Sequence, residues 1–420
     1  MKDFGFSVDQ FQPRSQALRT LIERGHLNQA TNLAGIDAAF EAGIVTAYVG
    51  FDATADSLHV GHLLPIMTLR RLQQAGHRPI VLIGGGTTRI GDPSFRSDAR
   101  PMLSDAQIAA NIDGIKTVFE RLLTFGDGPT DAVMVNNADW LDSVRWIDML
   151  REVGRHFSIN RMLSFDSVIS RLEKQENLTF LEFNYMILQA FDFLELSRRC
   201  NCGLQMGGAD QWGNIVSGID LIRRLDRKEV FGLTAPLLTT ASGAKMGKTA
   251  AGAVWLNADR LSPYEYWQFW RNTEDADVGR FLRLFTDLST VEIGKLTEND
   301  GSEINSLKER LATEATALVH GIDAAKHAAA TARQAFEGHG VPVGVPTLEL
   351  NGAERDRGIP LVELLVRTGL TSSKGEGRRM ILGRGIKLND TVVEDPDLIV
   401  QPSSLPVKLS VGRRRHAVVR

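Results

Sequence analysis

The chain has 420 residues, of which 43% are hydrophobic and 24% charged, and its formal net charge is −3. This length and composition indicate a globular protein of two or three domains. The sequence has no apolar run of about 18 residues, which excludes a membrane-spanning helix. The N-terminal residues include acidic side chains and lack the apolar stretch of a secretory signal, so we expect a cytoplasmic protein. Cys200 and Cys202 are too close for an unstrained disulfide and lack partners for zinc, so we expect no protein-bound metal.

Predicted helices and strands alternate through the first part of the chain. The helices cover residues 16–24, 60–72 and 105–123, and the strands cover 44–50, 78–84, 132–136 and 203–207. Between the last two strands, residues 142–200 are largely helical in pattern. Strands that alternate with helices at this spacing are typical of α/β proteins. We therefore predict a Rossmann-like, doubly wound parallel sheet with a helical insertion over residues 1–235.

The remaining chain changes character twice. Residues 262–336 are helical in pattern, and a Gly/Pro-rich stretch at 338–346 is typical of a domain linker. We predict a helical domain over 236–337, a linker over 338–356 and a small α+β module over 357–420. The module has 12 Lys and Arg against 6 Asp and Glu, which leaves −9 for the rest of the chain. A basic end on an acidic body favours an appended nucleic-acid-binding module.

The first motif is Thr-Ala-Asp-Ser-Leu-His-Val-Gly-His at residues 54–62, where a predicted strand leads into a helix. Ligands of parallel sheets bind at the carboxyl ends of strands, and a helix N-terminus there attracts phosphate. Thr54, His59 and His62 offer hydrogen-bond donors to a nucleotide, and Gly61 lets a flat adenine approach the backbone. Alone, the two histidines fit half a zinc site or a chance helical pair equally well.

A second motif, Lys-Met-Gly-Lys-Thr at residues 245–249, lies in a Ser/Gly-rich loop. Lys245 and Lys248 in a mobile loop can close over a triphosphate and neutralise the charge that develops at the α-phosphate. Alone, the segment could be a solvated basic turn. The order of the two motifs, with the lysine loop far downstream, resembles the pair of signatures of class I aminoacyl-tRNA synthetases.

A third constellation consists of Tyr185, Gln189 and Asp192. Positions i, i+4 and i+7 share one face of a helix, so a phenol, an amide and a carboxylate would point into one pocket. An amino acid's ammonium group and a phenolic hydroxyl would supply the hydrogen-bond partners that such a buried face needs. The alternative is a polar cluster whose members satisfy one another between helices.

Four sequence blocks extend the resemblance to one branch of these synthetases. From about residue 40 to its C-terminus the chain resembles bacterial tyrosyl-tRNA synthetases, through the blocks at 48–52, 91–94, 185–192 and 207–214. The resemblance implies that L-tyrosine reacts with Mg²⁺-bound ATP to give tyrosyl-adenylate and pyrophosphate. The tyrosyl group would then pass to the 3′-terminal adenosine of tRNA(Tyr). It also implies a homodimer built through helices in the 130–170 region.

The resemblance further implies roles for individual residues. Tyr48 and Asp192 would bind the phenolic hydroxyl, and the other contacts to tyrosine would come from Asp92, Tyr185, Gln189 and Gln211. The residues that would line ATP and the adenylate are Gly50, Asp52, Gly61, Gly208, Asp210 and Lys248. The residues that would act on the reacting phosphates are Thr54, His59, His62, Lys245, Lys248 and Thr249, with Arg96 and Arg100 near pyrophosphate.

Residues 359–401 resemble the S4-type RNA-binding fold that ends such synthetases. A helix that starts after a serine N-cap presents Lys374, Arg378 and Arg379, and Lys387 lies on the strand that follows. These cations would contact tRNA phosphates rather than read bases. A basic helix face that is merely solvated is the alternative.

Three other functions remain to be weighed. A tryptophanyl-tRNA synthetase is the nearest relative, but Tyr48 and Asp192 favour a phenol, and the basic C-terminal end also argues against it. A nucleotidyltransferase with the same nucleotide signature would usually be shorter and lack both the lysine loop and the RNA module. An RNA-binding regulator with an inactive catalytic domain is disfavoured because every polar position named above is present.

Overall fold

The computed structural model describes residues 11–93, 102–243, 246–249, 252–297, 303–337, 346–351, 358–389, 391–401, 405–412 and 415–420. The chain forms two compact units. The first comprises Met1–Gly247, Trp255–Asn257 and Glu274–Asp300, and the second comprises Lys248–Val254, Ala258–Thr273 and Gly301–Arg420. Segments of the predicted helical domain thus belong to both units. The domain boundaries proposed from the sequence stay a prediction.

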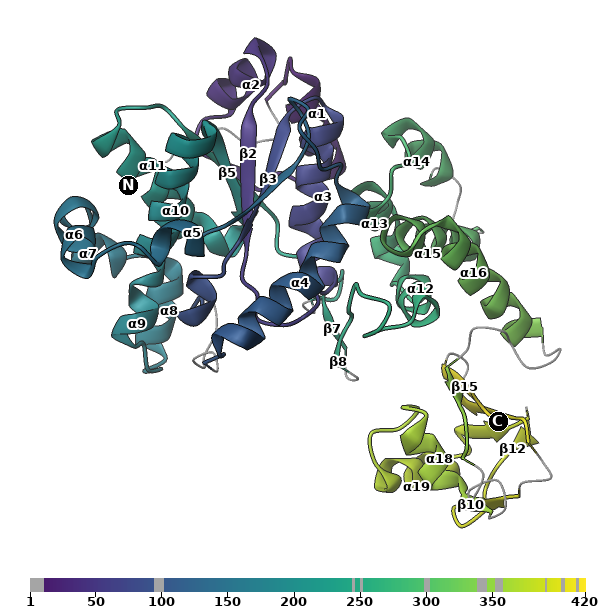
Figure 1. The fold of residues 1–420 in the computed structure, drawn as a ribbon. Helices are drawn as coiled ribbons and strands as arrows, with labels where there is room; N and C mark the ends of the chain where they lie inside the picture. Colours follow the sequence, from purple (N-terminus) through teal and green to yellow (C-terminus); the bar gives the residue numbers. More distant parts are fainter. Residues whose placement is uncertain are drawn as a thin grey trace. The chain divides into compact units, whose positions relative to one another are not determined.

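A six-stranded sheet forms the centre of the first unit (Figure 1). In spatial order its strands are β1 (Gln29–Ala30), β6 (Phe231–Ala235), β5 (Cys202–Gly208), β2 (Thr46–Phe51), β3 (Arg78–Ile83) and β4 (Val133–Asn136). All neighbours run parallel except the edge pair β1–β6. The predicted doubly wound α/β fold is therefore confirmed. The strand order reverses between β2 and β5, which is where ligands bind in sheets of this kind.

Helices cover both faces of this sheet, with α10 and α11 on one face and α3 on the other (Figure 1). The long helices of the unit are α1 (Gln16–Arg24), α2 (Leu33–Ala42), α3 (Val60–Gln74), α4 (Asp105–Leu122), α10 (Tyr185–Cys200), α11 (Trp212–Leu225), α13 (Val278–Phe285) and α14 (Thr290–Thr297). Their ends follow local chemistry. The side chain of Ser15 caps α1, and Gly25 ends it at φ +80°, where a residue with a Cβ is disfavoured.

Short helices make up the insertion between β4 and α10. They are α5 (Ala138–Leu141), α6 (Trp146–Asp148), a π-helical turn (Met149–Val153), α7 (Ile159–Met162), α8 (Asp166–Glu173) and α9 (Phe180–Phe183). Trp140 from α5 is buried with Phe193 of α10 and Tyr48 of β2 in one hydrophobic core. This core therefore joins the insertion and α10 to the central strand of the sheet.

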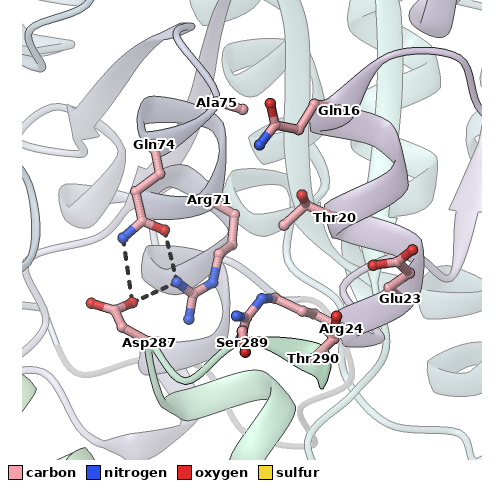
Figure 2. Close-up of a pocket in the computed structure, with 10 residues that line it drawn as sticks. All are labelled: Gln16, Thr20, Glu23, Arg24, Arg71, Gln74, Ala75, Asp287, Ser289 and Thr290. Carbon is pink, nitrogen blue, oxygen red and sulfur yellow. Dashed lines mark hydrogen bonds and ion pairs between the residues drawn. The ribbon is translucent and has the colours of Figure 1, made fainter. Parts of the chain in front are cut away.

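Two arginines attach α13 to the sheet domain (Figure 2). Arg24 of α1 donates to the carbonyls of Arg283, Thr286 and Leu288 at the end of α13. Arg71 of α3 donates to the Thr286 carbonyl and, at 2.5 Å, to the Asp287 carboxylate. Arg24, Arg71 and Asp287 line a pocket of about 380 Å³. Cations placed at the C-terminal end of α13 also interact favourably with the helix dipole.

The second unit contains two kinds of structure. Its helices α12 (Pro263–Arg271), α15 (Ile304–His320) and α16 (Ile322–Glu337) pack together, and Trp267 and Trp270 of α12 are buried. The lysine loop contributes the β7 (Lys248–Thr249) and β8 (Gly252–Ala253) hairpin. No helix in the described part of the chain is long and apolar enough to cross a membrane.

The C-terminal module has its own hydrophobic core. It contains α18 (Leu361–Arg367), α19 (Lys374–Leu382) and a five-stranded sheet in the order β12 (Thr391–Val392), β11 (Ile386–Leu388), β14 (Val407–Val411), β15 (Arg415–Val419) and β9 (Thr347–Leu348). A second pair joins β10 (Ile359–Pro360) to β13 (Ile399–Val400). The predicted small α+β architecture is confirmed.

Candidate active site

The polar residues singled out in the sequence gather at the reversal point of the sheet. Tyr48, Gly50 and Asp52 lie on β2 or directly after it. Gly208 ends the neighbouring β5, and the turn that follows it, Ala209–Gln211, carries two more of the predicted residues. Helix α10 supplies the Tyr185, Gln189 and Asp192 face. The carboxyl ends of two adjacent parallel strands thus form the base of the candidate site.

The deepest part of the site contains a phenol and a carboxylate. Tyr48 is 1% exposed, and its Oη has no hydrogen-bond partner among the described residues. Asp192 is also buried, and its two oxygens accept from Trp140 Nε1 at 2.7 Å and Asn137 Nδ2 at 2.9 Å. Burial raises the pKa of Asp192 to about 7, although both hydrogen bonds oppose the rise. A buried phenol oxygen without a partner indicates a place for a ligand's polar atom.

The Asp52 carboxylate lies between the strand end and α10. It accepts from Thr87 Oγ1 at 2.8 Å and from Tyr185 Oη at 3.1 Å. Burial, together with the nearby Asp52, Asp92 and Asp192 carboxylates, raises the pKa of Tyr185 well above its usual value, so its hydroxyl stays protonated and donates.

A hydrogen-bonded chain of amides connects the remaining polar residues. Gln211 Nε2 donates to Asp92 Oδ2 at 2.9 Å and to Asp210 Oδ2 at 3.3 Å. Asn214 Nδ2 donates to the oxygens of both Gln211 and Gln189, at 3.1 and 2.9 Å. Because carboxylates only accept, they set the orientation of the Gln211 amide, and through Asn214 that of Gln189.

The two histidines of the first motif occupy the start of α3. His59 Nδ1 accepts the Gly61 N–H at 3.0 Å, and His62 Nδ1 accepts the His59 N–H at 3.2 Å. In a neutral imidazole the other nitrogen, Nε2, then carries the hydrogen, so both rings offer an Nε2–H donor beside a helix N-terminus. The lysine loop reaches this point, since a Cβ on Gly247 would lie 3.1 Å from His59 Nδ1.

Comparison with known proteins agrees with this geometry. Residues 41–337 match the family described as tRNA synthetases class I (W and Y). The chain belongs to this family. It is 58% identical to the tyrosine–tRNA ligase of Dinoroseobacter shibae over 412 aligned residues, and this alignment covers 98% of this chain and 99% of the relative. The tyrosine–tRNA ligase of Rhodospirillum rubrum is 57% identical over 411 residues, 97% of this chain and 98% of the relative.

Solved structures and a second family match extend the comparison. A C-terminally truncated mitochondrial tyrosyl-tRNA synthetase from Aspergillus nidulans superposes with a TM-score of 0.69 at 30% identity, covering 78% of this chain and 96% of that one. Residues 359–405 match the S4 domain. The class I synthetase resemblance and the S4 resemblance drawn from the sequence are therefore both confirmed.

Several predicted site residues of this synthetase fall outside the described part of the chain. Lys245, Arg96 and Arg100 lie outside the described residues, and of Lys248 and Thr249 only the backbone of β7 is described. Thr54 lies in the turn between β2 and α3. Within the described residues, no group of three or more His, Cys, Asp or Glu side chains could hold a metal ion.

The four predicted tRNA-contacting residues all lie in the C-terminal module. Lys374 pairs with Glu363 at 3.0 Å and Arg378 with Asp397 at 2.8 Å, and both pairs are at the surface. Arg379 and Lys387 are exposed. Surface ion pairs of this kind are weak, so phosphates can compete for the two paired cations.

Sequence reasoning missed four residues of this site. Thr87, Asn137 and Trp140 follow the ends of β3 and β4, and Asn214 lies in α11. Their types carry no signal of their own. Their positions do for the first three, because side chains just after the carboxyl ends of parallel strands line ligand sites.

Proposed function

We propose that this protein is a tyrosine–tRNA ligase that works in the cytoplasm in translation. It would activate L-tyrosine with ATP to tyrosyl-adenylate and then transfer the tyrosyl group to the 3′-terminal adenosine of tRNA(Tyr). The observation that carries the proposal is the pair of buried polar groups, Tyr48 Oη and the Asp192 carboxylate, at the deepest part of a class I synthetase site.

This pair suits the phenolic hydroxyl of tyrosine. The hydroxyl can donate to Asp192, which still has lone pairs after accepting two N–H groups, and can accept from Tyr48. Phenylalanine would leave the buried Tyr48 hydroxyl without a partner and give Asp192 no third donor, and an unsatisfied buried group costs about 1–3 kcal/mol. Tryptophan would place an indole N–H, a donor only, between them and leave the Tyr48 hydrogen unpaired.

The amide chain suits the other end of the amino acid. Asp92 supplies a negative charge for the α-ammonium, and the Gln189 oxygen retains a lone pair beside the one used by Asn214. Tyr185 lies on the same face of α10 as Gln189, and its hydroxyl donates to Asp52. Gly50, Gly208 and Asp210 lie at the ends of β2 and β5, where the adenylate would bind.

The first reaction would be an in-line attack of the tyrosine carboxylate on the α-phosphate of ATP, with the Mg²⁺ ion carried by the triphosphate. His59 and His62 would donate through Nε2 to the phosphates, and the Thr54, Lys245, Lys248 and Thr249 side chains would add charge and donors. Their contribution is electrostatic and strongest in the transition state. No proton needs to move, because the attacking carboxylate is already ionised.

Pyrophosphate exchange with each amino acid tests the proposal. Tyrosine should support ATP–pyrophosphate exchange, while phenylalanine and tryptophan should support it only weakly. Exchange with tryptophan but not tyrosine would assign the chain to the other branch of its family. No exchange with either, together with retained RNA binding, would favour a regulator without catalysis.

We further propose a homodimer formed through the insertion between β4 and α10. Its short helices expose large apolar side chains, among them Phe180 at 71%, Ile147 at 61%, Ile159 at 58% and Trp146 at 53%. Exposed apolar side chains gathered in this way mark interaction surfaces. Sedimentation at micromolar concentration should give a dimer, and Phe180→Asp should shift it towards the monomer.

For the second reaction, the S4 domain would hold the tRNA through phosphates. Arg379 and Lys387 are exposed, and the weak ion pairs of Lys374 and Arg378 can be exchanged for phosphate contacts. The affinity for tRNA should therefore fall steeply as the salt concentration rises.

A further inference from the structure

Thr87 and Asn137 join two carboxylates of the candidate site. Thr87 Oγ1 donates to Asp52 Oδ1 at 2.8 Å and accepts from Asn137 Nδ2 at 2.9 Å. The second hydrogen of Asn137 Nδ2 goes to Asp192 Oδ2, also at 2.9 Å. Thr87 and Asn137 are 2% and 1% exposed, so solvent does not compete for these bonds. An unbroken path of side-chain hydrogen bonds therefore connects Asp52 to Asp192.

Each hydrogen bond of this path can run in only one direction from donor to acceptor. Asp52 and Asp192 accept as carboxylates, so the single hydrogen of Thr87 must point at Asp52 and its lone pairs at Asn137. The Asn137 amide cannot turn over either, because its oxygen accepts the Gly86 N–H at 2.8 Å. Each group is thus oriented by its neighbours before any ligand binds.

Thr87 and Asn137 lie between two carboxylates that repel each other, Asp52 and Asp192. Asp52 is one of the charges that disfavour ionisation of Asp192. Thr87 and Asn137 place a donor on each carboxylate, which stabilises both negative charges at short range. Without the Thr87 hydroxyl, Asp52 would lose one of its donors, and the Asn137 NH₂ group would lose one of its two acceptors.

We propose that Thr87 is a positioning residue that holds Asp52, on the adenylate side, and Asp192, on the phenol side, in one fixed arrangement. The proposal rests on the tyrosine–tRNA ligase function proposed above. Thr87 acts on Asp52 directly and on Asp192 through Asn137. Its loss should therefore impair two functions at once, the preference for tyrosine over phenylalanine and the use of ATP.

Thr87→Val tests this, because valine keeps the shape of threonine and removes the hydroxyl. In pyrophosphate exchange, kcat/KM for tyrosine should fall about ten- to hundredfold, which corresponds to one lost bond to a charged group. The tyrosine/phenylalanine ratio should narrow, and KM for ATP should rise. Thr87→Ser restores the hydroxyl and should restore both values.

Thr68→Val is the matched control. Thr68 is 1% exposed, and its hydroxyl bonds the Leu64 carbonyl and His26 Nδ1, both at 3.0 Å, in the middle of α3. This variant should lower Tm without changing the tyrosine/phenylalanine ratio or KM for ATP. If Thr87→Val does not fold, Thr87→Cys, with a weakly donating thiol of similar size, should give the same two changes.

The proposal is overturned if Thr87→Val lowers only Tm, if only one of the two substrate readouts moves, or if Thr87→Ser behaves like Thr87→Val. Failure of the wild-type protein to activate tyrosine is a different result. That outcome would overturn the proposed function and, with it, the proposed role of Thr87 in positioning Asp52 and Asp192.

Discussion

Asp192→Asn changes a single acceptor in the pocket proposed to bind the phenolic hydroxyl, while keeping the shape of the side chain. In the native site the Asp192 oxygens accept from Trp140 Nε1 and Asn137 Nδ2, at 2.7 and 2.9 Å. Trp140 can only donate, and the Asn137 amide is oriented by the Gly86 N–H. The new NH₂ group would therefore face a donor in either orientation, and the substrate's phenol would lose its charged acceptor.

The size of the effect follows from that lost bond. A hydrogen bond to a charged group contributes about 1.5–3 kcal/mol, so kcat/KM for tyrosine should fall roughly ten- to hundredfold. Phenylalanine has no hydroxyl to lose, so its kcat/KM should change much less. The ratio of the two should narrow by about the same factor.

Pyrophosphate exchange at limiting amino acid measures both values of kcat/KM. Asp226→Asn is a suitable control. This carboxylate forms a 2.7 Å ion pair with Arg198 and is not part of the candidate site, so the variant should leave the tyrosine/phenylalanine ratio unchanged. An unaltered tyrosine/phenylalanine ratio in folded Asp192→Asn protein would refute the assignment of the pocket.

Four further predictions address charge, rate and domain function. The pKa of Asp192 is about 7 in the folded protein against its usual 3.8, so its protonated form favours folding at low pH. The free energy of unfolding of the wild type, measured by urea titration, should therefore fall relative to that of Asp192→Asn as pH rises from 4 to 8, by up to roughly 4 kcal/mol. Asp287 behaves oppositely. Burial raises its pKa, but its bonds to Arg70 and Arg71 outweigh burial and hold the pKa well below the usual value. Asp287→Asn should cost about 1–2 kcal/mol at pH 7, a figure reduced because the side chain is 35% exposed, and this difference should begin to shrink as pH falls below about 4 and keep shrinking towards the lowered pKa. Lys248→Ala should slow adenylate formation in stopped-flow measurements far more than it weakens tyrosine binding, and a collapse of tyrosine affinity at an unchanged rate would assign the loop to substrate binding instead. A chain that ends at Glu337 should keep pyrophosphate exchange but lose most tRNA charging, and full-rate charging would mean that the S4 domain does not anchor the tRNA.

The elements that the sequence predicted well have strong local signals. Helix α1 appears over 16–24 as expected, because a serine cap and a glycine with positive φ bound it. Strand β3 is a continuous apolar run that ends at a glycine turn. Strands β1 and β6 were not predicted from the sequence pattern. Strand β1 has two residues, and β6 (Phe-Gly-Leu-Thr-Ala) lacks a clear period, so both depend on partners in the sheet that no local pattern records.

In the candidate site, too, the features with a local sequence signal could be predicted and the others could not. Tyr185, Gln189 and Asp192 could be grouped from their helical spacing, and the structure places them on one helix, α10. Their hydrogen-bond partners could not be inferred. Asp192 bonds Trp140 and Asn137, which lie more than fifty positions earlier in the chain and become neighbours only when β4 packs beside β3.

The polar floor of the site lowers the stability of the fold in the absence of substrate. Tyr48 Oη is buried without a partner among the described residues, and Asp192 is buried at a raised pKa. Either condition opposes folding, because a buried polar group loses its hydration. A ligand with a phenolic hydroxyl would satisfy both groups at once, so binding free energy would offset what folding loses there. Sites that break the rules of stable packing in this way are where function is expected. Tyrosine should accordingly raise Tm more than phenylalanine does at equal concentration.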